Sequence, residues 1–163
     1  MMVITQFENL LKLLSEGGVR FIIVGGIAGR ARGASRVTDD LDLVYDRADD
    51  NIAKLVRTLK PIAPYPRGAP PGLPFFFDER QIKSGLNFTF VTSLGWLDLL
   101  GEATGGGTYD QLIGHSTPLE IFGHHVQCVT LEMLIRLKRA AGRPKDFEAI
   151  AELESLRLRS KDI

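Results

Sequence analysis

Two aspartates, Asp40 and Asp42, stand one residue apart at the start of an apolar segment that runs to Tyr45. Side chains alternate along a strand, so these two carboxylates point to one face while their apolar neighbours point to the other. Two carboxylates on one face repel each other unless a cation lies between them. A hard ion such as Mg2+ takes one or two carboxylates and leaves its other positions for water and phosphate oxygens. The pair therefore predicts a metal–phosphate site that takes Mg2+ or Mn2+. The alternative is that Asp39 and Asp40 simply end a turn before the strand.

Upstream of the acids lies a short apolar run, Phe21–Val24, whose β-branched residues predict a buried strand. Gly25 and Gly26 end it, and glycine lets backbone amides approach phosphates where a side chain would block them. Three arginines separate this turn from the acids, and the guanidinium group binds phosphate through two N–H groups. Arg36, beside Thr38, is the best phosphate ligand among them, although exposed arginines in such a polar segment are ordinary.

This arrangement resembles the nucleotidyltransferase superfamily and its GG…T-x-D-x-D signature. Within that superfamily the chain is most similar to small bacterial proteins related to AbiEii-type toxins. The resemblance implies an α+β nucleotidyltransferase fold, a mixed β-sheet flanked by helices. It also implies that Gly25, Gly26, Arg36 and Thr38 face the nucleotide and that the D-x-D pair holds the metal. Enzymes of the group often carry Ser directly after the two glycines, where this chain has Ile27-Ala28.

Asp98 is the lone charge in the apolar segment Leu94–Leu100, which we expect to be a strand. The resemblance implies a third carboxylate on a later strand, and Asp98 is the natural candidate as metal ligand or base. Three acids around two divalent ions would stabilise charge on the attacking hydroxyl and on the departing pyrophosphate. From the residues alone, a carboxylate paired with a core arginine or with backbone N–H groups is the alternative.

The segment Leu134–Asp146, LIRLKRAAGRPKD, is a second stretch that resembles AbiEii-type proteins. The resemblance implies that Lys138 and Asp146 face the nucleotide and that Lys138 neutralises triphosphate charge. The alternatives are structural: Lys138 is one charge on a solvated helix face, and Asp146 is favourable near a helix N-terminus.

Composition narrows the class of protein. Among 163 residues, 44% are hydrophobic and 25% charged, which is usual for a globular domain, and we expect residues 1–163 to form one. The formal net charge is zero, so no global field draws the chain to nucleic acid. A single cysteine, Cys128, and no long apolar run predict a cytoplasmic protein with no membrane segment. Spacing excludes a G-x-G-x-x-G dinucleotide motif, a P-loop and a Cys/His zinc site.

Periodicity and turn residues predict the remaining elements. We expect helices over 5–16 with Thr5 as cap, over 49–59, over 130–141 and over 144–157 with Phe147 on the buried side, followed by a frayed tail. We expect strands over 75–77 and 86–91, and a hairpin over 118–129. Six of the eight prolines lie between 61 and 74, which predicts a surface loop, either a lid or a tolerated insertion.

These observations and the resemblance together lead to one hypothesis. The chain transfers a nucleoside monophosphate from an NTP to a hydroxyl on RNA such as tRNA, or on a protein, as the toxin of a toxin–antitoxin pair with a cognate antitoxin. The catalytic residues would be Asp40, Asp42, Asp98 and Lys138. The alternative, which the missing Ser favours, is an inactive module that keeps the fold and binds a nucleotide or a partner.

Overall fold

One mixed sheet organises the computed structural model, which describes residues 4–161. Its seven strands lie in the order β3-β4-β5-β2-β1-β9-β8. Their bounds are β1 Phe21–Val24, β2 Asp40–Tyr45, β3 Tyr65–Pro66, β4 Asn87–Thr92, β5 Gly95–Leu100, β8 Ser116–Ile121 and β9 His124–Val129. Strand β2 is antiparallel to β1 and parallel to β5, while β1 is parallel to β9. The expected α+β architecture is confirmed.

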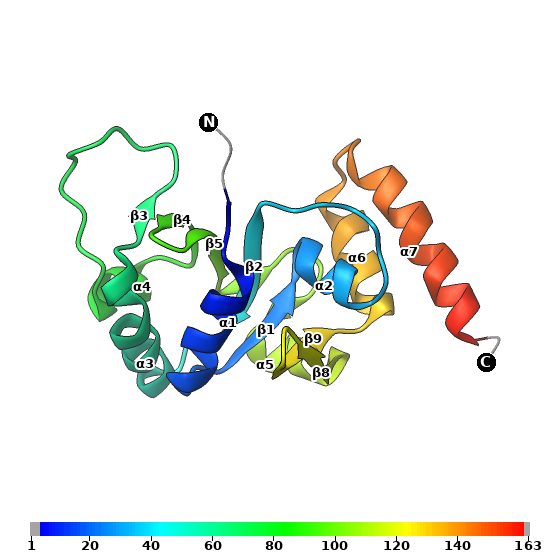
Figure 1. Cartoon of the computed structure of the whole chain (residues 1–163), viewed down its shortest axis with the longest axis horizontal. Helices are drawn as coiled ribbons and strands as arrows, with labels where there is room; N and C mark the ends of the chain where they lie inside the picture. Colours follow the sequence, from blue (N-terminus) through cyan, green and yellow to red (C-terminus); the bar gives the residue numbers. More distant parts are fainter. Residues whose placement is uncertain (1–3, 162–163) are drawn as a thin grey trace.

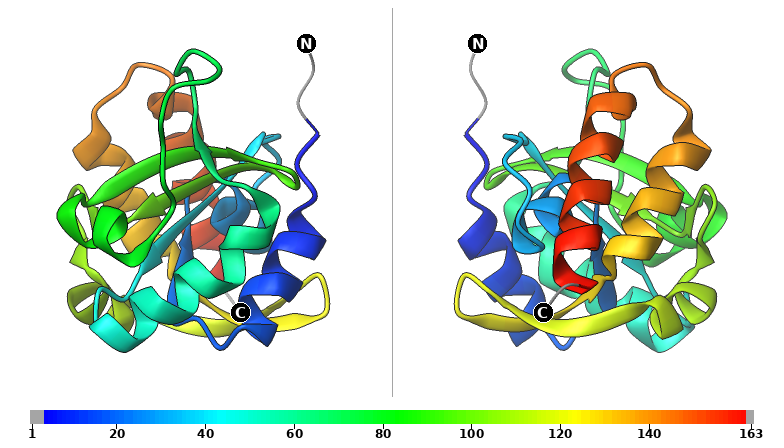
Figure 2. Two further views of the ribbon diagram at one scale, coloured as in Figure 1. Left: turned by 90° about the vertical axis from the view of Figure 1, so that its left-hand side faces the viewer. Right: turned by 90° about the vertical axis from the view of Figure 1, so that its right-hand side faces the viewer.

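Helices lie on both sides of this sheet (Figures 1 and 2). The longer ones are α1 Phe7–Glu16, α3 Asp49–Leu59, α6 Leu131–Ala141 and α7 Asp146–Lys161. The shorter ones are α2 Gly25–Ala31, α4 Glu79–Ser84 and α5 Tyr109–Leu112. Helices α1 and α3 pack together on one side, and α7 packs against α6 on the other. Two short strands, β6 Glu102–Ala103 and β7 Gly107–Thr108, form a separate ribbon.

The core forms where the apolar face of each element meets the sheet. Alternation along β2 sends Leu41 and Leu43 into the core with no exposed area, as the strand pattern predicts. The i, i+3, i+4 spacing of α1 places Leu10, Leu11 and Leu14 on its buried face. The same β2 alternation therefore directs the two aspartates to the opposite face, away from these leucines.

Most predicted elements are confirmed within one or two residues. Thr130 caps α6 by accepting a hydrogen bond from the Met133 amide, and Gly142 ends that helix in the left-handed conformation. The predicted hairpin forms as β8 and β9, and Cys128 is buried. The proline-rich segment contains a short 3-10 turn and the edge strand β3, which pairs with β4.

Four local predictions are wrong. Thr5 does not cap α1, because its hydroxyl binds the Asp39 carbonyl instead. Residues 75–77 form no strand: the rings of Phe75 and Phe77 pack against Phe90 from irregular chain, while Phe76 is exposed. Phe147 is 66% exposed although its spacing suggested the buried side of α7. The tail is helical to Lys161 rather than frayed from Leu158. Within residues 4–161, no helix is both long and apolar enough to cross a membrane.

Candidate active site

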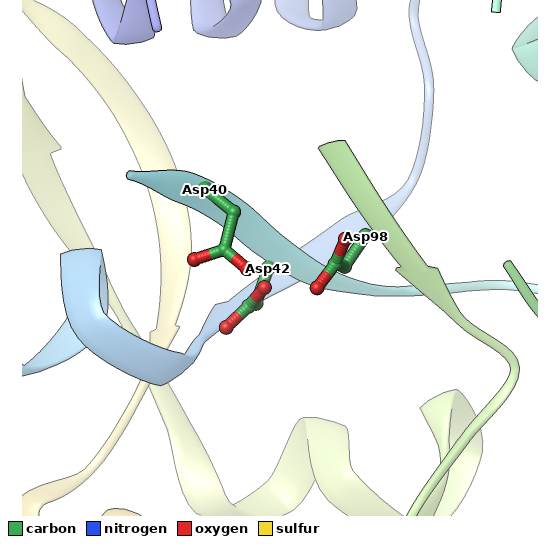
Figure 3. Close-up of side chains that lie close together, drawn as sticks. All are labelled: Asp40, Asp42 and Asp98. Atoms are coloured by element: carbon green, nitrogen blue, oxygen red, sulfur yellow. The ribbon is translucent and has the colours of Figure 1, made fainter. Parts of the chain in front are cut away.

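Three carboxylates converge at the centre of the sheet (Figure 3). Strands β2 and β5 are parallel neighbours, and their register pairs Asp42 directly with Asp98. Asp40 lies two residues earlier on β2 and so projects from the same face. One carboxylate oxygen from each of the three lies within 4.8 Å of the others. The predicted meeting of acids from two separate strands is therefore confirmed.

Asp42 is the most constrained of the three acids. Its Oδ1 atom is buried and has no hydrogen-bond partner among the described residues. Burial, followed by the charges of Asp40 and Asp98, raises the pKa of Asp42 to about 9, against the opposing charge of Lys138. Burial also raises the pKa of Asp98. A buried oxygen with no donor among like charges costs free energy, and a hard divalent cation removes that cost. The residues thus fit Mg2+ or Mn2+.

The Gly-Gly turn lies directly against these acids. Gly25 has a φ of +70°, and a Cβ atom on it would lie 2.1 Å from Asp42 Oδ2. A Cβ atom on Gly26 would lie 2.6 Å from the Cβ atom of Thr38. Real Cβ atoms do not approach other atoms so closely, so both positions require glycine. The backbone at the start of α2 is therefore in contact with both halves of the T-x-D-x-D segment.

Thr38 and Arg36 border the same region with different partners. The Thr38 hydroxyl donates a hydrogen bond of 3.1 Å to Asp40 Oδ1, which fixes the orientation of that carboxylate. Arg36 is about half exposed and forms an ion pair of 2.8 Å with Glu148, near the start of α7. Thr38 thus positions a triad member, while Arg36 links the loop before β2 to the last helix.

The lysine helix also reaches the site, as the resemblance implied. The Lys138 ammonium lies 3.7 Å from Asp146 Oδ1, and Arg143 pairs with Asp146 at 2.8 Å. Burial on its own would raise the pKa of the Asp146 carboxyl, but Arg143 and Lys138 lower it below its usual value. Asp146 is 3% exposed, so the carboxylate that pairs with Lys138 and Arg143 is itself buried.

A cavity of about 380 Å³ joins these groups. Its walls contain every predicted site residue, together with residues of α2, of the loop before β2, of α7 and of the turn before α7. They are Gly25, Gly26, Gly29, Ala34, Arg36, Val37, Thr38, Asp40, Asp42, Asp98, Lys138, Arg143, Lys145, Asp146, Ala149, Glu152 and Leu153. The cavity lining thus combines the three acids of β2 and β5 with the basic side chains of Arg36, Lys138, Arg143 and Lys145, which suits a polyanion bound through a metal ion.

One site residue was missed by sequence reasoning. Arg67, from the proline-rich segment, forms a 2.7 Å hydrogen-bonded ion pair with Asp98, and its other terminal nitrogen lies 3.9 Å from Asp40. Its guanidinium carbon lies 4.5 Å from the ring centroid of Trp96. The alternative considered for Asp98, pairing with an arginine, is thus present together with the triad. Arg67 lies in the proline-rich segment, which has no periodic pattern from which its place in the site could be predicted.

The chain has the nucleotidyltransferase fold, as its similarity to solved structures shows. A lincomycin-bound lincosamide antibiotic adenylyltransferase, LnuA, is 15% identical with a TM-score of 0.62 over 95% of this chain and 99% of that one. ANT(2'')-Ia in complex with adenylyl-2''-tobramycin is 19% identical, with a TM-score of 0.55 over 98% and 100%. An antigenic nucleotidyltransferase-like protein from Paracoccidioides brasiliensis is 16% identical, with a TM-score of 0.58 over 95% and 78%. Neither the protein-family models nor the curated proteins gave a match.

Proposed function

We propose that this protein transfers a nucleoside monophosphate from an NTP to a hydroxyl acceptor and releases pyrophosphate. The observation that carries the proposal is the convergence of Asp40, Asp42 and Asp98 beside two glycines that tolerate no side chain. The fold shared with LnuA and ANT(2'')-Ia supports the same reaction class. A bound Mg2+ or Mn2+ would neutralise phosphate charge and bring the reacting oxygens together.

The chain's own residues divide the work in this proposal. Asp40 and Asp42 would hold the metal, and the hydrogen bond from the Thr38 hydroxyl fixes the orientation of the Asp40 carboxylate. Asp98 completes the metal site or accepts the proton of the acceptor hydroxyl. Gly25 and Gly26 leave room for the triphosphate beside the backbone. Lys138 places a fixed positive charge where negative charge develops on the leaving group.

The finer part of the proposal concerns the acceptor. The two antibiotic-bound neighbours suggest that a small hydroxylated compound belongs among the candidates, beside RNA such as tRNA and protein. A role as the toxin of a toxin–antitoxin pair rests on the AbiEii-like motifs alone.

Label transfer tests the reaction class. The protein is incubated with each α-labelled NTP, Mg2+ and one of three acceptor pools: total cellular RNA, protein, or hydroxylated antibiotics. Transfer that Asp42→Asn abolishes supports the enzyme. Asp39→Asn is the matched control, because Asp39 is the exposed neighbour in the same motif and lies outside the triad. Tight NTP binding without transfer to any pool would instead support a nucleotide-binding module.

A further inference from the structure

The guanidinium group of Arg67 lies among the acids, where it supplies the positive charge that a metal ion would otherwise supply. It contacts two of the three triad members, Asp98 at 2.7 Å and Asp40 at 3.9 Å. The Arg67 side chain is 21% exposed, so these contacts lie largely out of water. A divalent ion bound by the same two carboxylates would stand close to this positive charge and be repelled by it. The arginine and the ion therefore compete for the same two carboxylates.

Two further contacts give the arginine a position that does not involve the triad. The guanidinium lies over the ring of Trp96, and one terminal nitrogen also donates to the Phe90 carbonyl at 2.9 Å. Neither partner is an acid, so a metal ion bound by the carboxylates would not compete for either contact. A rotation of the Arg67 side chain that breaks its contact with Asp98 would leave that carboxylate free to bind an ion.

The backbone that carries Arg67 is fixed by strand pairing. Strand β3 pairs with β4 immediately before Arg67, and the Arg67 amide donates to the Thr89 carbonyl at 2.9 Å. The exchange therefore needs a rotation of the side chain and leaves the paired backbone in place. The proline-rich segment thus contributes one cation to the site from an anchored position.

We propose that Arg67 is an internal cation of the acidic triad: it holds Asp98 and Asp40 in the metal-free protein, and a divalent ion displaces it. The inference rests on the proposed function for the identity of the metal site. Arg67 thereby sets the metal affinity of the free protein. The triphosphate brings additional ligands to the ion, so nucleotide binding should raise metal occupancy further.

Metal binding without nucleotide tests this directly. Mn2+ binding is measured by calorimetry for the wild type, Arg67→Met and Arg67→Gln, with thermal melting as a check on folding. We expect both variants to bind Mn2+ about tenfold more tightly than the wild type, within the usual range for coupled binding equilibria. Arg20→Met is the matched control, since Arg20 also bridges two carboxylates, Asp46 and Asp50, away from the triad. Its Mn2+ affinity should equal that of the wild type.

Trp96 provides a second readout, because it is the chain's single tryptophan and lies under the guanidinium. Mg2+ should change Trp96 emission saturably in the wild type and much less in Arg67→Met. Unchanged or weaker Mn2+ affinity in both Arg67 variants would overturn the inference, as would an absence of Mn2+ binding in every protein. Label transfer by the wild type at saturating Mg2+ separates the two ideas. If the wild type transfers no label while the Arg67 variants still bind Mn2+ more tightly, only the proposed function is contradicted.

Discussion

Gly25 lies so close to Asp42 that a Cβ atom at position 25 would be 2.1 Å from Asp42 Oδ2. Gly25→Ala should therefore displace the carboxylate and abolish transfer. It should also lower the free energy of unfolding by more than the roughly 1–2 kcal/mol that an alanine in the left-handed conformation costs. Gly18→Ala is the control, because Gly18 has nearly the same φ, +69°, with nothing within 4 Å of its added Cβ. Urea unfolding and label transfer measure both effects. If Gly25→Ala and Gly18→Ala show the same stability and the same label transfer, the close approach of Gly25 to Asp42 is not needed for either.

The raised pKa of Asp42 predicts how stability depends on pH without metal. The unfolded carboxyl loses its proton near its ordinary pKa of 3.8, whereas the folded one keeps it up to about 9. The unfolded state therefore binds fewer protons over that interval, and the free energy of unfolding falls as pH rises from about 4 to 9. In EDTA, Asp42→Asn should be more stable than the wild type at pH 8 and show a smaller advantage at pH 5.

Urea unfolding at the two pH values checks this prediction, with Asp39→Asn as the control. Because Asp39 is exposed and outside the triad, its substitution should leave the wild-type pH dependence unchanged. If the stability of Asp42→Asn depends on pH as that of the wild type does, the pKa of Asp42 is not raised in the folded protein.

Lys138→Met should weaken NTP binding while the fold is retained. Asp146 keeps its 2.8 Å ion pair with Arg143, so the substitution leaves no buried carboxylate unpaired. A charged contact to phosphate is worth about 1.5–3 kcal/mol, so we expect a KM for NTP roughly tenfold or more above that of the wild type. Arg139→Gln, on the same helix and paired with Glu154, should leave the KM unchanged. An unaltered KM in Lys138→Met would assign this lysine to packing alone.

Thr38→Val tests the orientation of Asp40. It removes the hydroxyl that donates to Asp40 Oδ1, and a hydrogen bond of this kind contributes about 0.5–1.5 kcal/mol. The rate of label transfer should fall up to about tenfold, and Thr38→Ser should restore most of it. If serine is as slow as valine, the methyl group rather than the hydroxyl is what matters at this position.

The sequence was sufficient for the triad and insufficient for Arg67, for a physical reason. Alternation along a strand is a local property, so it predicted the shared face of Asp40 and Asp42. Asp98 stood out as the lone acid in an apolar strand, and the family resemblance implied its place beside the pair. Arg67 reaches the acids only through the pairing of β3 with β4, which joins segments distant in sequence. A proline-rich segment has no periodicity from which such pairing can be read.

Helix α7 shows the same limit. Its apolar spacing suggested a buried Phe147, yet this residue is exposed because α7 packs mainly on α6 rather than on the sheet. The partner of a helix is decided by tertiary packing, which its own sequence does not specify.

Anomalous diffraction from crystals grown with Mn2+ and a non-hydrolysable NTP tests the central claim most directly. We predict an anomalous peak for a manganese ion bound by Asp40 and Asp42, with the triphosphate beside Gly25. We also expect Arg67 to be withdrawn from Asp98. Manganese absent from the three acids, with Arg67 still paired to Asp98, would contradict the account.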